Sequence, residues 1–197
     1  MRQSKYFHIL RPFLEVPLFT VKDAESKGIP RHALAYFVKI GVLERLYPGA
    51  YRSVDYEQKV AFPLEHVAWA TTSIREGVIC LISALCIYNL TDQVMREVWI
   101  AIPNRAYASK RPDSRIIRMR NIDLGKTEMM LGEYKVKIFD KERCVVDAFR
   151  YLSHEIAIKA LRRYLRDKNH KPDLKKLQKY AKILRVKITP YLLAYTT

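Results

Sequence analysis

The stretch LFTVKDAESKGIPRHALAYFVKIGVLERLYPGAYR, Leu18–Arg52, decides how the amino-terminal part of the chain folds. Thr20 is expected to cap a short helix over Val21–Lys27, because its hydroxyl can accept a free N–H group of the first turn. Gly28 ends that helix, and a second helix follows over about Arg31–Ile40. Two short helices joined by such a tight turn indicate a helix-turn-helix.

The second helix separates an apolar face from a polar one. Helical spacing puts four apolar residues on the inward side, namely Ala33, Leu34, Phe37 and Val38. The opposite side carries the residues that we expect to line the major groove of DNA, namely Arg31, His32, Tyr36 and Lys39. Arg31 lies near the helix start, so it is the best candidate for a bidentate contact with guanine.

A basic β-hairpin is expected directly after this helix. Residues 42–46 and 50–52 can pair as strands around Tyr47-Pro48-Gly49, which makes a wing. Its expected phosphate contacts are Arg45, Tyr51 and Arg52. A recognition helix followed by a basic wing is typical of winged helix-turn-helix DNA-binding proteins. The alternative is a small helical hairpin without a ligand, and the wing and the basic face favour DNA binding over it.

Charge and composition agree with a polyanionic partner. The chain has 36 Lys and Arg against 20 Asp and Glu, a formal charge of +16 and a pI near 9.8. No apolar run reaches the roughly 18 residues of a spanning helix, and the start lacks the features of a signal peptide, so no membrane partner is expected. Three cysteines, an odd number, favour a reduced, cytoplasmic protein with buried thiols.

No cofactor or metal is expected. The five histidines are scattered, no Cys/His pair has zinc spacing, and the six glycines form no phosphate-binding loop. The chain also contains a nuclease-like string: Pro112-Asp113 is followed by Glu133-Tyr134-Lys135, with nineteen residues between Asp113 and Glu133. In PD-(D/E)xK nucleases two such carboxylates hold Mg²⁺ and the lysine assists water. Here Asp113 falls in a polar loop and Glu133 at a turn, so a catalytic site is not expected.

The pattern changes after residues 53–62, where apolar periodicity is weak. We therefore predict two domains: a winged helix-turn-helix over 1–55, and an α+β domain over 63–197 with a small, mainly antiparallel sheet packed with helices and a helical carboxy-terminal tail. The expected strands are 78–81, 97–103, 115–120, 129–131 and 134–139. The expected helices are 64–74, 83–88, 141–152, 154–166, 173–183 and a short one after Pro190.

Basic residues are concentrated in the tail. Between residues 150 and 187 the chain has thirteen Lys and Arg against three acidic residues. Eight of them form a second candidate basic surface: Lys159, Arg162, Arg163, Arg166, Lys175, Lys176, Lys179 and Lys182. Like charges at i,i+3 and i,i+4 repel, which is easier to explain if phosphates neutralise them. The alternative is a solvated face that serves solubility, and the sequence alone leaves both open.

The motifs together resemble a known family. LFTVKDAESKGIP and GVLERLYPGAYR resemble the amino-terminal winged-helix domain of the AbiEi abortive-infection antitoxins. The resemblance continues through CLISALCIYNLTDQ, EVWIAIP and KERCVVDAFRYLSHEIAIKALRRYL, and so extends over nearly the whole chain. In one respect the sequence departs from the pattern: Pro30 stands where relatives usually have a Ser or Thr cap before the recognition helix.

The resemblance implies the antitoxin of a type IV toxin–antitoxin pair and no enzymatic activity. Such a protein binds double-stranded operator DNA with inverted repeats through its winged helix and represses its own operon. Its carboxy-terminal domain counters a nucleotidyltransferase-like toxin without forming a stable complex. Two alternatives stay open: a solitary transcriptional regulator without a toxin, and a DNA-binding, Mg²⁺-dependent nuclease.

Overall fold

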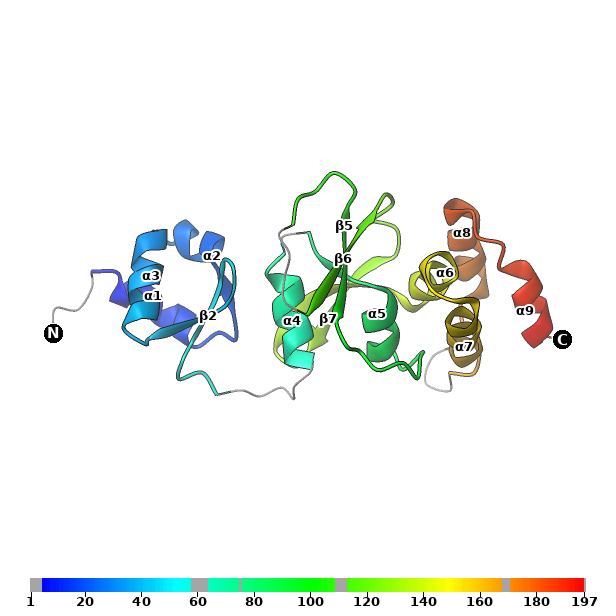
Figure 1. Cartoon of the computed structure of the whole chain (residues 1–197), viewed down its shortest axis with the longest axis horizontal. Coiled ribbons are helices and arrows are strands. Elements are labelled where there is room, and N and C mark those ends of the chain that lie inside the picture. The colour runs from blue at the N-terminus through cyan, green and yellow to red at the C-terminus, as the bar shows by residue number, and fades with distance from the viewer. Residues whose placement is uncertain (1–4, 58–63, 75, 109–112, 168–170, 197) are drawn as a thin grey trace. The chain divides into compact units, whose positions relative to one another are not determined.

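The chain forms two compact units in a computed structural model, which describes residues 5–57, 64–74, 76–108, 113–167 and 171–196 (Figure 1). The first unit comprises residues Met1–Arg75 and Met130–Lys135. The second comprises Glu76–Met129 and Val136–Thr197. Helix α4 (Leu64–Thr72) is thus grouped with the amino-terminal part. The domain division that we predict at residues 55–63 stays a prediction, and residues 58–63 lie outside the described part.

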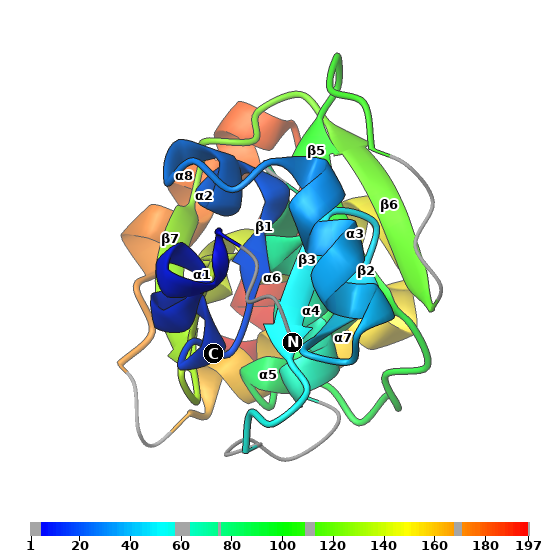
Figure 2. The same ribbon diagram turned by 90° about the vertical axis from the view of Figure 1, so that its left-hand side faces the viewer.

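The first unit is a winged helix-turn-helix with an additional amino-terminal helix. Its elements up to the wing are α1 (Phe7–Leu14), β1 (Phe19–Thr20), α2 (Val21–Ser26), α3 (Arg31–Lys39), β2 (Leu43–Tyr47) and β3 (Ala50–Ser53). The three strands form an antiparallel sheet in the order β1-β3-β2. Figure 2 views this unit from the side of α1–α3, with β2 and β3 next to α3. The predicted helices and wing are confirmed, whereas α1 and β1 were not predicted.

Local sequence explains where these helices begin and end. The Thr20 hydroxyl accepts a hydrogen bond from the Asp23 N–H at 3.3 Å, and the Asp23 carboxylate accepts one from the Thr20 N–H at 2.7 Å. This capping box begins α2 as expected. Gly28 follows α2 with φ +87°, a conformation that costs glycine little. Pro30 is the residue before α3 and offers no side-chain cap, but its φ of −76° suits the start of a helix.

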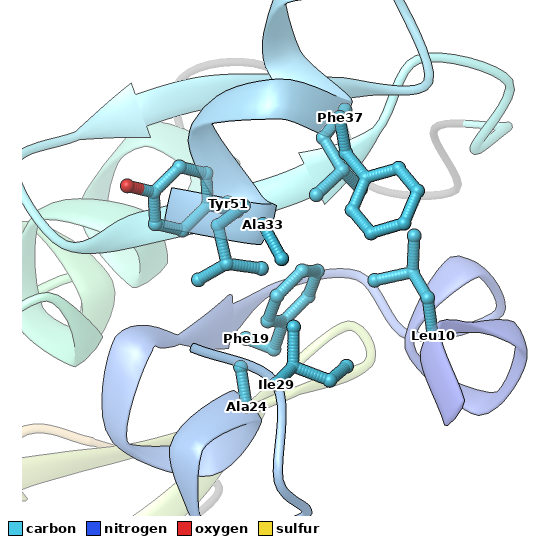
Figure 3. Packing of buried hydrophobic residues seen from close by; sticks show 9 residues of the cluster. Leu10, Phe19, Ala24, Ile29, Ala33, Phe37 and Tyr51 are labelled. Carbon is cyan, nitrogen blue, oxygen red and sulfur yellow. The ribbon is translucent and has the colours of Figure 1, made fainter. Parts of the chain in front are cut away.

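An apolar core holds α1, α3 and the sheet together (Figure 3). Leu34 and Phe37 of α3 are fully buried in it, as the helical spacing predicts. The Phe7 ring of α1 lies 6.2 Å from the Phe37 ring, and Leu10 of the same helix is also fully buried. Helix α1 therefore packs against the inward face of α3 and fixes which face of α3 points outward.

The second unit contains a five-stranded sheet and five helices within its described residues. Its elements are β4 (Val78–Ile79), α5 (Leu81–Ile87), β5 (Val98–Pro103), β6 (Ser114–Met119), β7 (Lys126–Leu131), β8 (Tyr134–Phe139), α6 (Lys141–Tyr151), α7 (His154–Leu165), α8 (Leu174–Leu184) and α9 (Thr189–Thr196). Strands β7 and β8 belong partly to this unit, because the turn that joins them and its flanking residues lie in the first. The α+β class is confirmed.

The expectation of a mainly antiparallel sheet was wrong. The strand order is β6-β5-β4-β8-β7; β4 pairs with β5 antiparallel, whereas β5–β6 and β4–β8 are parallel. The sheet is therefore mixed. Side chains alternate between the two faces of a strand whichever way its neighbour runs, so alternation in the sequence carries no information about strand direction.

Helix α6 is anchored in the second unit by a buried ion pair. The Arg143 Nε donates to Asp147 at 2.7 Å, and its Nη1 donates to the carbonyl oxygens of Asn121 and Leu124, both at 2.8 Å. Both charged side chains are buried. A buried guanidinium needs such a full set of acceptors, because an unpaired buried charge is costly. The pair thus ties α6 to the segment before β7.

Candidate nucleic-acid interface

Helix α3 presents a polar face to solvent. The Arg31 side chain is 74% exposed and Tyr36 is 44% exposed, and His32 and Lys39 are exposed as well. Between them lies the small, exposed residue Ala35. The structure therefore brings all four predicted groove-facing residues onto one face of one helix. A helix of this kind fits the width of the DNA major groove.

Arg31 is oriented by a neighbouring helix. Its Nε lies 2.9 Å from Glu25 Oε1, at the end of α2. An ion pair this exposed contributes little to stability. It leaves the two terminal nitrogens of the guanidinium without an ion pair in the described part of the chain. Those two nitrogens form the fork that contacts guanine O6 and N7.

The residue before α1 is an aromatic one that lies beside the recognition helix. The Tyr6 ring meets the His32 ring edge-on, with 6.3 Å between the centroids. The Lys5 ammonium lies 5.0 Å from the centre of the same Tyr6 ring. Sequence analysis missed both residues, and the only signal was the aromatic and basic composition of KYFH before the winged helix.

The wing does not present its basic residues as expected. Arg45 is exposed. Arg52, by contrast, is only 12% exposed: its Nη2 and Nε lie 2.6 and 2.8 Å from Glu44, and its Nη1 lies 2.9 Å from Glu65. Its guanidinium also lies 4.6 Å from the centre of the Trp69 ring. Arg52 is therefore largely buried and paired with two carboxylates, and the structure does not present its charge to solvent as we expected.

Tyr51 is also placed differently from our expectation. The residue is buried, and its ring stacks on Phe19 with 6.0 Å between centroids and 28° between planes. Tyr51 is thus a core residue of the sheet (Figure 3). Arg52 and Tyr51 are adjacent in the strand and therefore point to opposite faces of the sheet, and neither of the two side chains is exposed.

A buried polar network surrounds Glu65 of α4. Glu65 Oε1 accepts hydrogen bonds from Arg52 Nη1 at 2.9 Å and from the Tyr134 hydroxyl at 2.7 Å, and Trp69 Nε1 donates to the same hydroxyl at 2.9 Å. Burial raises the pKa of Tyr134 above its usual value. The other oxygen of Glu65, Oε2, is buried without a hydrogen-bond partner in the described structure. The network joins the wing, α4 and the β7–β8 turn within the first unit.

The described charged residues of the nuclease-like string lie in turns or at exposed positions. Glu133 lies in the β7–β8 turn, where its carboxylate accepts a hydrogen bond from Tyr56. Burial, with this hydrogen bond, raises the pKa of Tyr56 to about 12. Lys135 and Asp113 are exposed, and Pro112 lies outside the described residues. Within the described part of the chain, no group of three or more His, Cys, Asp and Glu residues could hold a metal ion.

The basic residues of the tail fall into two classes. Lys159 pairs with Glu155 at 2.9 Å and with Asp92 at 3.4 Å. Lys176 pairs with Asp140 at 3.0 Å and with Glu142 at 3.1 Å. The other class is exposed and has no ion pair to a described residue: Arg162, Arg163, Arg166, Lys175, Lys179 and Lys182. Of the eight residues of the second candidate basic surface, only these six offer charge that no described carboxylate neutralises.

The fold and the exposed face of α3 together define the class, a winged helix-turn-helix protein with a DNA-binding arrangement. Residues 12–54 match the model of a family described as transcriptional regulator, AbiEi antitoxin. The match confirms the resemblance over the winged helix and supports a DNA-binding regulator; the three later stretches lie beyond it. No curated protein matches the chain. None of the helices, within the described residues, has the length and apolar character needed to cross a membrane.

Proposed function

We propose that this protein is a sequence-specific transcriptional repressor that acts in the cytoplasm and inserts α3 into the major groove of its operator. The observation that carries the proposal is the division of α3 into a fully buried face and an exposed basic face. Leu34 and Phe37 hold the helix on the core, and Arg31, His32, Tyr36 and Lys39 point away from it. Arg45 of the wing, whose side chain is exposed, contacts the adjacent phosphate backbone in this proposal.

Binding to the DNA upstream of the protein's own gene tests the readout. Fluorescence anisotropy would compare that DNA with a shuffled duplex of equal length at fixed salt. Arg31→Ala should weaken binding to the operator by about 1–3 kcal/mol, because one bidentate base contact is lost, and should change binding to the shuffled duplex far less.

Arg118→Ala is the matched control, since Arg118 is an exposed arginine on β6 in the second unit. It removes the same charge without touching α3, so operator preference should persist. If Arg31→Ala weakened binding to both duplexes equally, α3 would not be the element that reads the sequence.

We further propose that the protein is the antitoxin of a type IV pair that autoregulates its operon, without forming a stable complex with a nucleotidyltransferase-like toxin. The match of residues 12–54 to the AbiEi antitoxin model supports this. Co-expression with the product of any adjacent nucleotidyltransferase-like gene tests it: growth should be restored by wild-type protein and also by Arg31→Ala. Absence of such a gene, or absence of rescue, would favour a solitary regulator.

A further inference from the structure

A basic cavity in the second unit has no role in groove readout. It measures about 570 Å³ and lies between the carboxy-terminal end of α5, the start of α6 and the last turns of α7. We propose that it binds a phosphate-bearing ligand of mononucleotide size, either a free nucleotide or the phosphorylated end of an RNA strand. This proposal does not depend on the DNA-binding function, because no residue of the winged helix lines the cavity.

Two arginines of α7 and Arg166, the residue that caps the end of the helix, supply the positive charge of the cavity. Arg162, Arg163 and Arg166 all line it. Arg162 and Arg166 are exposed, lie one turn apart on the helix and have no ion pair to a described residue. Arg163 Nη1 donates to the Thr91 carbonyl oxygen at 2.5 Å, which holds its guanidinium in place. The planar fork of arginine matches the oxygens of a phosphate, so this trio can hold one from several directions.

The remaining cation of the cavity is already neutralised. Lys141 Nζ lies 2.6 Å from Asp167 Oδ2, and both residues line the wall. Lys141 also lies 5.9 Å from the centre of the Tyr88 ring. The positive charge available to a ligand is therefore that of the arginines, on the α7 side of the cavity.

The rest of the cavity lining is mixed: two half-buried side chains, Ile87 and Tyr88, the exposed Asn89 and the buried Leu90. Ile87 is the last residue of α5, and the other three follow it directly in the chain, so an aromatic ring and an amide group lie beside each other here. Burial raises the pKa of the Tyr88 hydroxyl further above its usual value. A wall of this kind suits the base and sugar of a nucleotide better than it suits a bare inorganic ion. The volume also falls within the roughly 300–1,000 Å³ of ordinary small-molecule sites.

Neither solubility nor helix stability accounts for this arrangement. Arginines near the carboxy-terminal end of a helix do interact favourably with its dipole, but only by about 0.3–1 kcal/mol each. That effect requires no hollow and no second wall. Solubility is served equally well by exposed charges outside the cavity, such as Lys179 and Lys182 of α8.

Isothermal titration calorimetry on the full chain tests the proposal with four probes: AMP, adenosine, inorganic phosphate, and a 5′-phosphorylated RNA trinucleotide. AMP should bind at least about tenfold more tightly than adenosine or inorganic phosphate, because only AMP uses both walls. Tighter binding of the trinucleotide than of AMP would assign the site to a strand end, and the reverse order would assign it to a free nucleotide. Either order supports a phosphate site.

The double variant Arg162→Ala/Arg166→Ala should lower AMP affinity at least about tenfold. Its matched control is Lys179→Ala/Lys182→Ala, which removes the same charge on α8 outside the cavity and should leave AMP affinity within about twofold, because distant charges are screened. A third variant, Arg162→Lys/Arg166→Lys, keeps the charge but loses the planar guanidinium fork. Its affinity for AMP should therefore lie between that of the wild type and that of Arg162→Ala/Arg166→Ala. All four altered side chains are exposed, so the variants should fold.

The proposal is overturned if AMP does not bind, if adenosine binds as well as AMP, or if both double-alanine variants lose affinity equally. Operator binding is measured on the same samples, so that failure of the nucleotide-site proposal can be told apart from failure of the proposed repressor function. Arg31→Ala should lose operator preference and keep AMP binding. The double variant Arg162→Ala/Arg166→Ala should show the opposite result: it should lose AMP binding and keep its operator preference. That result would place the nucleotide site in the second unit.

Discussion

The recognition helix and the wing carry similar charge in the sequence but use it differently. On α3 the side chain of Arg31 extends into solvent and keeps two guanidinium nitrogens without an ion pair to a described residue. On the wing Arg52 is held by Glu44 and Glu65, and Tyr51 lies in the core. The lesson is that the number of basic residues overstates the charge a surface offers, because part of it holds the protein together.

The largest expected effect concerns stability. Arg52→Ala should lower the free energy of unfolding by about 3–5 kcal/mol, because it leaves Glu65 buried without its cation. Arg45→Ala, on the same hairpin but exposed, should change it by less than about 0.5 kcal/mol. Urea unfolding followed by Trp69 fluorescence, in a Trp99→Phe background, measures both. If the two variants lowered the free energy of unfolding equally, Arg52 would contribute no more to stability than Arg45 does.

The next effect compares the contribution of the basic tail to DNA binding with that of α3. Changing Arg162, Arg166, Lys175 and Lys179 to Glu should weaken binding to operator and to shuffled DNA by the same factor, because these residues lie outside the recognition helix. The slope of log K against log salt should fall by about 0.9 for each one that contacts a phosphate. If affinity, slope and toxin neutralisation all survive, this face is a solvated surface.

A smaller effect separates the two arginines of the wing on DNA. Arg45→Ala should reduce the salt slope by about 0.9, because one phosphate contact is lost. A conservative change at the second position, Arg52→Lys, should leave the slope unchanged, since that charge is already matched by Glu44 and Glu65. Titrations at several salt concentrations measure both. A fall of similar size for Arg52→Lys would show that the DNA displaces the carboxylates.

The smallest effect concerns Glu142, the carboxylate that pairs with Lys176 of the tail. Burial would raise the pKa of Glu142, but hydrogen bonds from Tyr164 and Lys176 outweigh it and hold the pKa below its usual value of 4.5. The folded state therefore gains stability above that pH and loses it as the pH falls through the lowered pKa. Glu142→Gln should flatten this acid loss, measured by thermal unfolding between pH 6 and about 3. An unchanged pH profile would argue against the pairing.

The winged helix could be predicted from the sequence because its signals are local. The Thr20 cap, the breaks at Gly28 and Gly41, and the apolar spacing of Leu34 and Phe37 all lie within one short stretch. The same signals placed the exposed face of α3 correctly. Helix α1 was missed because Pro12 interrupts its pattern, although the structure accommodates this proline within the helix.

The pairing of Arg52 and the direction of the strands could not be predicted, because both depend on residues far along the chain. Arg52 meets Glu65 thirteen residues later, and Glu65 meets Tyr134 another sixty-nine residues on. No periodicity encodes such contacts, so Arg52 looked as available as Arg45. The parallel pairing of β5 with β6 was missed for a related reason, since strand direction depends on the connection and not on the strand itself.

The β7–β8 turn has a consequence for how such proteins can recombine. Residues 130–135 are grouped with the winged helix, although the strands that carry them continue into the sheet of the second unit. A gene fusion that exchanged only residues 1–57 would separate the wing from Glu65, Trp69 and Tyr134. The part of the gene that would have to be exchanged to keep these contacts is therefore longer than the winged helix. It also consists of two segments that are separated in the chain. Specificity should change by substitution on α3 more readily than by shuffling whole domains.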